Sequence, residues 1–252
     1  WAIYNFIMKP KIGGSTYCKQ NLESELRNLK SLGYDFAELD LGSPIEPNKT
    51  FETELKKVKN IIPILVGHLP EIDFKKEEIE KCKKVIEILS NQNINLFVIH
   101  LFSRNLPTEN NFDLKIKYLK ELTDFAKSKN SVLVLENTEE DVDTLKKVFN
   151  KIPEINFCLD IGHANLFAKE NRSIGLINNF GKVLKHIHIH DNVGGDAEKF
   201  DLHLPIGAGR INFTPIFDKL KEMKYLGNIT LEVYNPDKEY RKISIGRVRK
   251  LL

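Results

Sequence analysis

Short runs of β-branched and aromatic residues alternate along this chain with longer segments in which apolar residues recur at helical spacing. The runs with strand character cover residues 2–8, 35–41, 62–68, 95–101, 131–136, 155–160, 184–190 and 228–234. The segments of helical period cover residues 19–32, 50–60, 75–91, 111–129, 139–150, 163–180, 213–225 and 237–250. Alternation of strand and helix predicts parallel strands joined by right-handed crossovers. Eight such units in 252 residues predict a single (β/α)₈ barrel, with one domain over residues 1–252.

Within the last four predicted strands, alternate residues separate into an outward face toward the helices and an inward face toward the barrel axis. Most of the apolar residues fall on the outward face, and Val134 is expected on the inward one. Each inward face carries an acid or an imidazole near the C-terminal end of its strand: Glu136, Asp160, His188 and Glu232. Deeper on the same inward faces, we expect His186 to be a satisfied core histidine and Cys158 to serve in packing.

The four inward residues predict a metal site at the rim formed by the carboxyl ends of the strands. Any one of them could equally be an ordinary buried hydrogen-bonding residue. Together they are harder to explain in that way, because buried carboxylates without partners are costly and close carboxylates repel one another. A cation would stabilise the set. Its mixed oxygen and nitrogen donors suit Mn²⁺, Co²⁺ or Zn²⁺ better than Ca²⁺.

Five more residues of metal-binding type lie at or beyond the ends of apolar runs, and they bring the total to nine. They are His68, His100, His163, Asp201 and His203. The longest connection, from Asp191 to about Asn212, is of a length more often functional than idle. Within it, Gly207 and Gly209 lie beside Arg210, and we interpret them as a turn in preference to a phosphate-binding loop.

Composition and charge exclude several classes of protein. The net charge is +3, with 29% charged residues, and lysines alternate with glutamates on helical segments, which is typical of solvated helix faces and not of a nucleic-acid footprint. Cys18, Cys82 and Cys158 have no CxxC spacing and cannot all pair. No apolar run is long enough to span a membrane, and the first residues lack the features of a signal peptide. We therefore expect a cytoplasmic protein with reduced thiols and no membrane partner.

Five segments resemble the xylose-isomerase-like TIM-barrel superfamily, which holds sugar phosphate isomerases and epimerases together with endonuclease IV, also called AP endonuclease family 2. They are LEN at 135–137, LDIGH at 159–163, HIHDN at 188–192, DLHLPIGAGRINF at 201–213 and LEV at 231–233. The resemblance runs through most of the chain in strand order. LGYDFAELDL at 32–41, in which Glu38 is expected to point inward, also looks like the isomerase branch.

The isomerase and epimerase branch implies one divalent metal held by Glu136, Asp160, His188 and Glu232, with the two glutamates as the catalytic acid and base. His188 is assigned over its neighbours because the family pattern places an aspartate three positions later, here Asp191. The resemblance implies a small sugar or sugar-phosphate substrate, whose carbonyl and adjacent hydroxyl the metal would hold while the enediolate forms. The residues expected to bind the substrate are His68, His100, His190 and Arg210.

The endonuclease IV branch implies instead a cluster of three zinc ions that uses all nine residues and cleaves DNA at abasic sites. His68 and His100 would share one zinc with Glu136, and His163, Asp201 and His203 would hold another. Three departures favour the isomerase branch: the first predicted strand lacks an HxS-type segment, the turn after the second is short, and the arginines expected on rim loops, Arg104 and Arg210, are few for a DNA groove.

A third hypothesis is a catalytically idle barrel that serves as a binding or scaffold domain. It predicts that the protein purifies without metal, whereas the isomerase hypothesis predicts one metal per chain and the nuclease hypothesis predicts three zinc ions. The sequence leaves open the identity of the sugar, the choice between isomerisation and epimerisation, the metal, and whether the chain forms a homo-oligomer.

Overall fold

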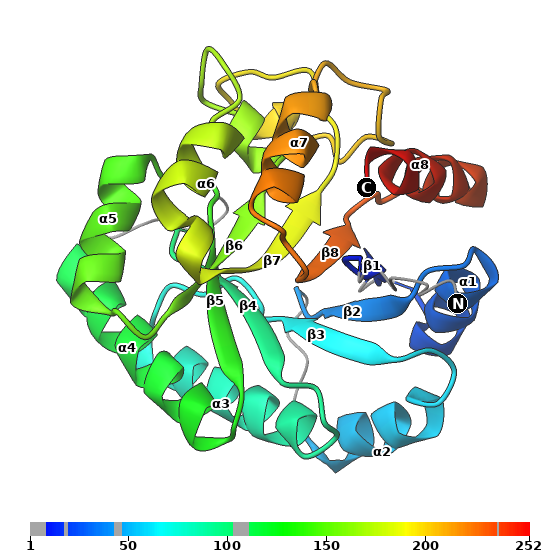
Figure 1. The fold of residues 1–252 in the computed structure, drawn as a ribbon. Helices are drawn as coiled ribbons and strands as arrows, with labels where there is room; N and C mark the ends of the chain where they lie inside the picture. The colour runs from blue at the N-terminus through cyan, green and yellow to red at the C-terminus, as the bar shows by residue number, and fades with distance from the viewer. Residues whose placement is uncertain (1–8, 18–19, 43–46, 103–110, 236) are drawn as a thin grey trace, which may run out of the picture.

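A computed structural model describes residues 9–17, 20–42, 47–102, 111–235 and 237–252. Eight parallel strands, β1 to β8, pair in sequence order, and β1 pairs with β8 to close the barrel (Figure 1). This closure confirms the fold that the alternation of strands and helices predicts. The strands are Ile12–Ser15, Phe36–Asp40, Ile64–His68, Leu96–His100, Val132–Glu136, Asn156–Asp160, Leu184–Ile189 and Asn228–Leu231.

The helices form an outer ring around the strands, and α8, in red, lies beside the blue segment of β1 and α1 (Figure 1). Buried Arg241 of α8 joins these ends of the barrel through an ion pair with Glu25 of α1, at 3.0 Å. None of the described helices combines the length and apolarity required to cross a lipid bilayer. Helices α1 to α8 are Leu22–Ser31, Lys49–Val58, Lys76–Ser90, Phe112–Ser128, Val142–Lys151, Ser173–Phe180, Thr214–Glu222 and Lys238–Leu251.

The core has two parts, as the alternating strand pattern predicts. A large cluster lies between the strands and the helices and includes the outward residues Leu135, Leu159 and Ile187. A smaller cluster fills the barrel interior and contains Phe36, Val66, Val98, Val134 and Cys158. Side chains alternate along each strand, so the residue two positions after an interior residue also points toward the barrel axis, one layer nearer the rim. Val66, Val98, Val134 and Cys158 are each followed in this way by a residue of metal-binding type. Those residues are His68, His100, Glu136 and Asp160.

The first strand of the barrel differs from the prediction. Residues 2–8, which the sequence pattern assigns to it, lie outside the described residues, and the strand that pairs with β2 and β8 is Ile12–Ser15. Its two glycines lack strand propensity, but the fold requires their small size. A Cβ atom on Gly13 would lie 2.3 Å from the ring of Phe36, and one on Gly14 would lie 2.5 Å from Leu29.

The segment predicted as one helix over 163–180 is interrupted. A 3₁₀ turn, η1, covers His163–Asn165, and α6 begins only at Ser173. Arg172 lies between them, and its guanidinium donates to the carbonyl oxygens of Glu139 and Glu140, both at 2.9 Å. The chain leaves β6 through this turn, which places His163 at the rim instead of on a helix surface.

Candidate metal centre at the carboxyl rim of the barrel

Strands β5 to β8 bring together the four residues that the sequence analysis assigns to a metal. Donor atoms of Glu136, Asp160, His188 and Glu232 all lie within 4.8 Å of one another, and all four residues are buried. The register of the sheet helps to bring these residues together, because Asp160 of β6 lies directly beside His188 of β7. His188 Nδ1 lies 3.0 Å from Glu136 Oε2 and 3.3 Å from Glu232 Oε1.

Several donor atoms of this quartet are buried without a hydrogen bond among the described residues. They are Glu136 Oε1, Asp160 Oδ2 and His188 Nδ1. Buried polar atoms nearly always have a partner, so three unbonded donor atoms within one quartet fit a shared cation. Three carboxylate oxygens with one imidazole nitrogen suit Mn²⁺, Co²⁺ or Zn²⁺. The quartet therefore fits the divalent metal that the sequence analysis expects.

His68 and His100 form a second group around Glu136, from the ends of β3 and β4. Their Nε2 atoms lie 3.1 Å and 3.0 Å from Glu136 Oε2. His68 Nδ1 donates to the Leu69 carbonyl oxygen at 3.0 Å, which turns its Nε2 toward the site. The rings of the two histidines meet edge to face, with centroids 4.8 Å apart. This arrangement suits either a second metal or contact with a substrate.

A third group lies over β6 and β7 and consists of residues that reach the rim from η1, from the end of β7 and from the connection between β7 and α7. His163 Nε2 and His203 Nε2 lie 3.3 Å and 3.5 Å from Asp201 Oδ2. His190 Nε2 lies 3.6 Å from Asp201 Oδ1 and 3.4 Å from Asp160 Oδ1. The four residues have donor atoms within 4.8 Å of one another.

The third group is held in place by close contacts of the backbone. A Cβ atom on Gly162 would lie 2.2 Å from the His190 ring, so this position requires glycine. His203 adopts φ 44°, a region that costs a non-glycine residue about 1–3 kcal/mol. Its Nδ1 donates to the Glu232 carbonyl oxygen at 2.9 Å, which stabilises the strained conformation and aims Nε2 toward Asp201. Strain of this kind is typical of functional sites.

The carboxylates and imidazoles of the rim lie close enough to shift one another's pKa values. Burial alone would raise the pKa of Glu136, but His188, His100 and His163 together hold that pKa well below its usual range. Burial, assisted by the nearby Glu136 carboxylate, raises the pKa of Glu232. Burial alone would lower the pKa of His68, but the hydrogen bond and charge of Glu136 raise that pKa to about 9. Without a metal, the imidazoles therefore compensate the carboxylates by holding protons.

The stability of the metal-free protein is expected to fall as the pH rises above neutrality. The pKa of His68 is above its ordinary value of about 6.5, so its stabilising contribution is complete below about pH 6.5 and is lost as the pH rises through about 9. The raised pKa values of His163 and His188 act in the same direction. Urea unfolding in chelator at about pH 6 and about pH 9.5 measures the difference. His68→Gln should reduce this difference in the free energy of unfolding. A metal-free protein that is more stable at the alkaline pH would contradict the prediction.

The connection after β7 is organised around Asp191. The Asp191 carboxylate accepts backbone N–H groups from Gly207 and Gly209, at 2.8 Å and 2.9 Å, and from Asn192 and Ile211. The two glycine amides are thus already bonded and are not available to a phosphate, in agreement with their interpretation as a turn. The aspartate that follows the predicted metal histidine fixes the loop that carries Asp201 and His203.

The residues expected to bind substrate occupy different environments. The side chains of His68 and His100 are each 13% exposed at the centre of the rim, and His190 is fully buried between Asp160 and Asp201. Arg210 is exposed, and its backbone amide donates to the Asn192 carbonyl oxygen at 2.8 Å. Arg104 lies outside the described residues.

Two contacts near the site escaped the sequence analysis. Glu38 on β2 accepts from His188 as well as from His186, and Asn137 binds both backbone polar groups of Asp160, at 2.9 Å and 3.0 Å. The inward position of Glu38 is visible in the strand alternation, but its partner lies 150 residues away in the chain. No local pattern indicates such a contact.

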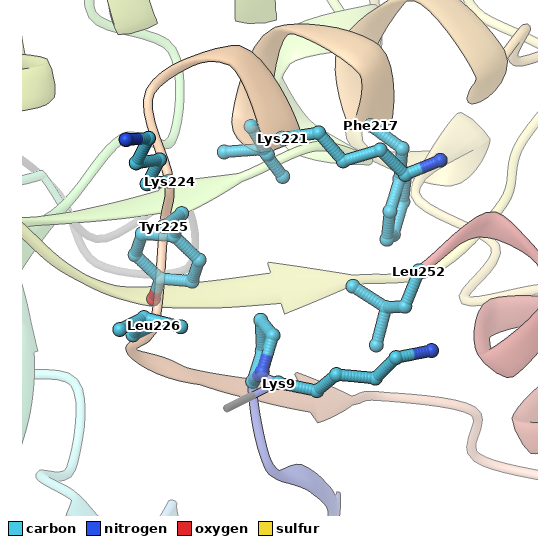
Figure 2. Close-up of a pocket in the computed structure, with 9 residues that line it drawn as sticks. Lys9, Phe217, Lys221, Lys224, Tyr225, Leu226 and Leu252 are labelled. Carbon is cyan, nitrogen blue, oxygen red and sulfur yellow. The ribbon is translucent and has the colours of Figure 1, made fainter. Parts of the chain in front are cut away.

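An apolar pocket of about 440 Å³ opens at the opposite end of the barrel, where the strands begin. Figure 2 shows that Phe217, Tyr225, Leu226 and Leu252 form its apolar wall, with Lys9 at its edge. It contains none of the rim histidines or carboxylates, and the active sites of barrels of this type lie at the carboxyl ends of the strands. We assign no function to it.

Comparison with known proteins identifies one protein family that covers most of this chain. Residues 26–250 match a family model described as xylose isomerase-like TIM barrel. Two uncharacterized proteins of Methanocaldococcus jannaschii are 39% identical over 94 and 90 residues, which is 37% and 34% of this chain. The matched segments span only 30% and 32% of the length of those relatives.

Solved structures similar to this chain include a D-tagatose 3-epimerase-like protein, which is 22% identical with a TM-score of 0.77 over 96% of both chains. A xylose isomerase domain protein from Planctomyces limnophilus is 14% identical, with a TM-score of 0.78 over 96% of this chain and 97% of the other. An L-ribulose 3-epimerase is 16% identical, with a TM-score of 0.75 over 96% of this chain and 94% of the other. At these identities the similarity establishes the fold.

Proposed function

Because this chain belongs to the xylose isomerase-like TIM barrel family, we propose that it is a divalent-metal-dependent enzyme that isomerises or epimerises a sugar or sugar phosphate. The observation that carries the proposal is the buried quartet of Glu136, Asp160, His188 and Glu232 at the carboxyl rim. The epimerases among the similar structures support it as relatives of the same fold.

In the proposed reaction, Glu136 and Glu232 move the proton beside the substrate carbonyl. A divalent cation held by the quartet would bind the carbonyl and adjacent hydroxyl oxygens and stabilise the negative charge that develops there. One glutamate accepts the proton, and the other returns a proton to the opposite face or to the neighbouring carbon. Glu136 and Glu232 both approach His188 Nδ1, so they line the same small space from β5 and from the end of β8.

A solvent-exchange experiment across a panel of sugars tests the proposal. Protein loaded with Mn²⁺, Co²⁺ or Zn²⁺ is incubated in D₂O with ketoses, aldoses and their phosphates. Deuterium should enter at the carbon beside the carbonyl of at least one substrate. Glu136→Gln and Glu232→Gln should suppress the exchange. Full exchange in both variants with metal still bound would reject the assigned roles, and no exchange with any sugar would reject the function.

A second candidate is an endonuclease IV-like enzyme that cleaves DNA at abasic sites, because the structure gathers all nine metal-type residues into three adjoining groups. Metal content separates the candidates, since this one requires three zinc ions per chain. Asp201→Asn provides the matched variant. It alters the third group and leaves the quartet intact, so it should abolish nicking of an abasic duplex in a nuclease. One metal per chain with no nicking would reject this candidate.

A further inference from the structure

Glu38 is a fully buried carboxylate in the barrel interior, directly below the candidate metal centre. It projects from β2, where it pairs in register with Ser15 of β1 and Val66 of β3. Its two oxygens bridge two histidines of β7: Oε2 lies 3.0 Å from His186 Nε2, and Oε1 lies 3.0 Å from His188 Nε2. The bridge crosses the barrel from one side to the other.

Glu38 differs from the rim carboxylates in the way its oxygens are satisfied. Each oxygen accepts one N–H from an imidazole, whereas Glu136 Oε1 and Asp160 Oδ2 make no hydrogen bond among the described residues. Glu38 belongs to none of the groups of described residues whose donor atoms converge for a metal. It is therefore a partner of the histidines and not a ligand.

The hydrogen bond from His188 also runs in the opposite sense to those of the other rim histidines. His68 and His203 each donate from Nδ1 to a backbone carbonyl oxygen, and both present Nε2 to the site. His188 donates from Nε2 to Glu38, and its Nδ1 faces Glu136 and Glu232. A carboxylate can only accept, so Glu38 requires the hydrogen on Nε2.

We propose that Glu38 is a positioning residue, which keeps a hydrogen on Nε2 of His188 and thereby makes Nδ1 the nitrogen that loses its proton and binds the metal. The proposal rests on the metal site of the proposed function. His186 completes the arrangement, because its N–H satisfies the second oxygen of Glu38 and fixes the carboxylate plane. Thr230 Oγ1, 3.2 Å from His186 Nε2, supports that ring in turn.

Glu38→Gln tests the proposal with almost no change of volume. An amide has one acceptor, so it cannot receive N–H groups from both histidines. Its NH₂ group facing His188 would favour hydrogen on Nδ1, where the metal must bind. Affinity of the full-length chain for Cd²⁺ is expected to fall about 10- to 100-fold. The matched control is Glu140→Gln, which makes the same change at a buried carboxylate bonded to Thr138, and it should retain the affinity of the parent chain.

NMR of histidine labelled with ¹⁵N provides a readout that a merely structural role would not change. In the Cd²⁺-loaded parent chain, cadmium should couple to His188 Nδ1 and hydrogen should reside on Nε2. This measurement needs no variant, so it holds even if Glu38→Gln fails to fold. Cadmium coupling to Nε2, or a Glu38→Gln affinity within twofold of the parent, would overturn the proposal.

The experiment also separates this proposal from the proposed function. A parent chain that binds Cd²⁺ through Nδ1 of His188 but catalyses no proton exchange would reject the isomerase and retain Glu38 as a positioning residue. A parent chain that exchanges substrate protons but binds Cd²⁺ through Nε2 would reject only the role of Glu38. Failure to bind Cd²⁺ at all would overturn the positioning role together with the metal site.

Discussion

Replacement of Glu136 by glutamine is expected to lower metal affinity and to reduce kcat/KM by about 10²- to 10⁴-fold. Glu136 Oε2 is the meeting point of the site, at 3.1 Å from His68, 3.0 Å from His100 and 3.0 Å from His188. An amide removes the negative charge at this point. Three imidazoles would then face one another around a neutral group.

Metal content and deuterium exchange measured on the same preparations test this expectation. Glu140→Gln is again the matched control, because Glu140 is buried on the short segment that follows Glu136 but bonds to Thr138 instead of to the site. Only the change at position 136 should reduce both quantities. A Glu136→Gln protein with its full complement of metal and unchanged exchange would show that this carboxylate is neither ligand nor catalyst.

Removal of metal is expected to lower the melting temperature by about 8–16 °C. A ligand present at about a thousand times its Kd stabilises the folded state by about 4 kcal/mol, and each kcal/mol shifts Tm by about 2–4 °C in a domain of 150–250 residues. The physical cause is the buried quartet, whose carboxylates repel one another without a cation.

Thermal scans at constant pH, with chelator and then with Mn²⁺, Co²⁺ or Zn²⁺ restored, measure the shift. Recovery on restoring metal distinguishes binding from irreversible damage. Glu136→Gln should show a much smaller shift, because it lacks the central ligand. Identical melting curves for parent protein with chelator and with metal would mean that the quartet binds no cation, as the scaffold hypothesis predicts.

The sequence predicts most of the barrel because strand periodicity separates its two faces. Val134 and Cys158 lie in the interior cluster, whereas Leu135 and Leu159 lie between strands and helices, as alternation requires. The first strand is the exception. The short strand Ile12–Ser15 contains two glycines whose value is the space they leave for Phe36 and Leu29, and packing of that kind cannot be recognised from propensity.

In the candidate site, too, the sequence predicts positions within one strand but not contacts between distant parts of the chain. The positions of Glu136, Asp160 and His188 follow from where their strands end. The bond between Glu38 and His188 joins residues 150 positions apart, and only the closure of the barrel brings them together. The position of His163 also depends on a local departure from the predicted helix, since η1 takes the place of its first turn.

The origin of the donors has a consequence for how such a protein diversifies. Glu136, Asp160 and His188 belong to strands, whose register the hydrogen-bonded ladder fixes. Asp201 and His203 belong to the connection between β7 and α7, which is held to the barrel by the Asp191 carboxylate, by the bond from His203 to the Glu232 carbonyl oxygen and by buried Ile206. If the quartet binds a metal as proposed, exchange of that one connection between related genes is expected to change the third group of donor atoms and to leave the quartet in place. A barrel built in this way has one set of candidate ligands fixed by its strands and a second set on a loop that can be replaced independently.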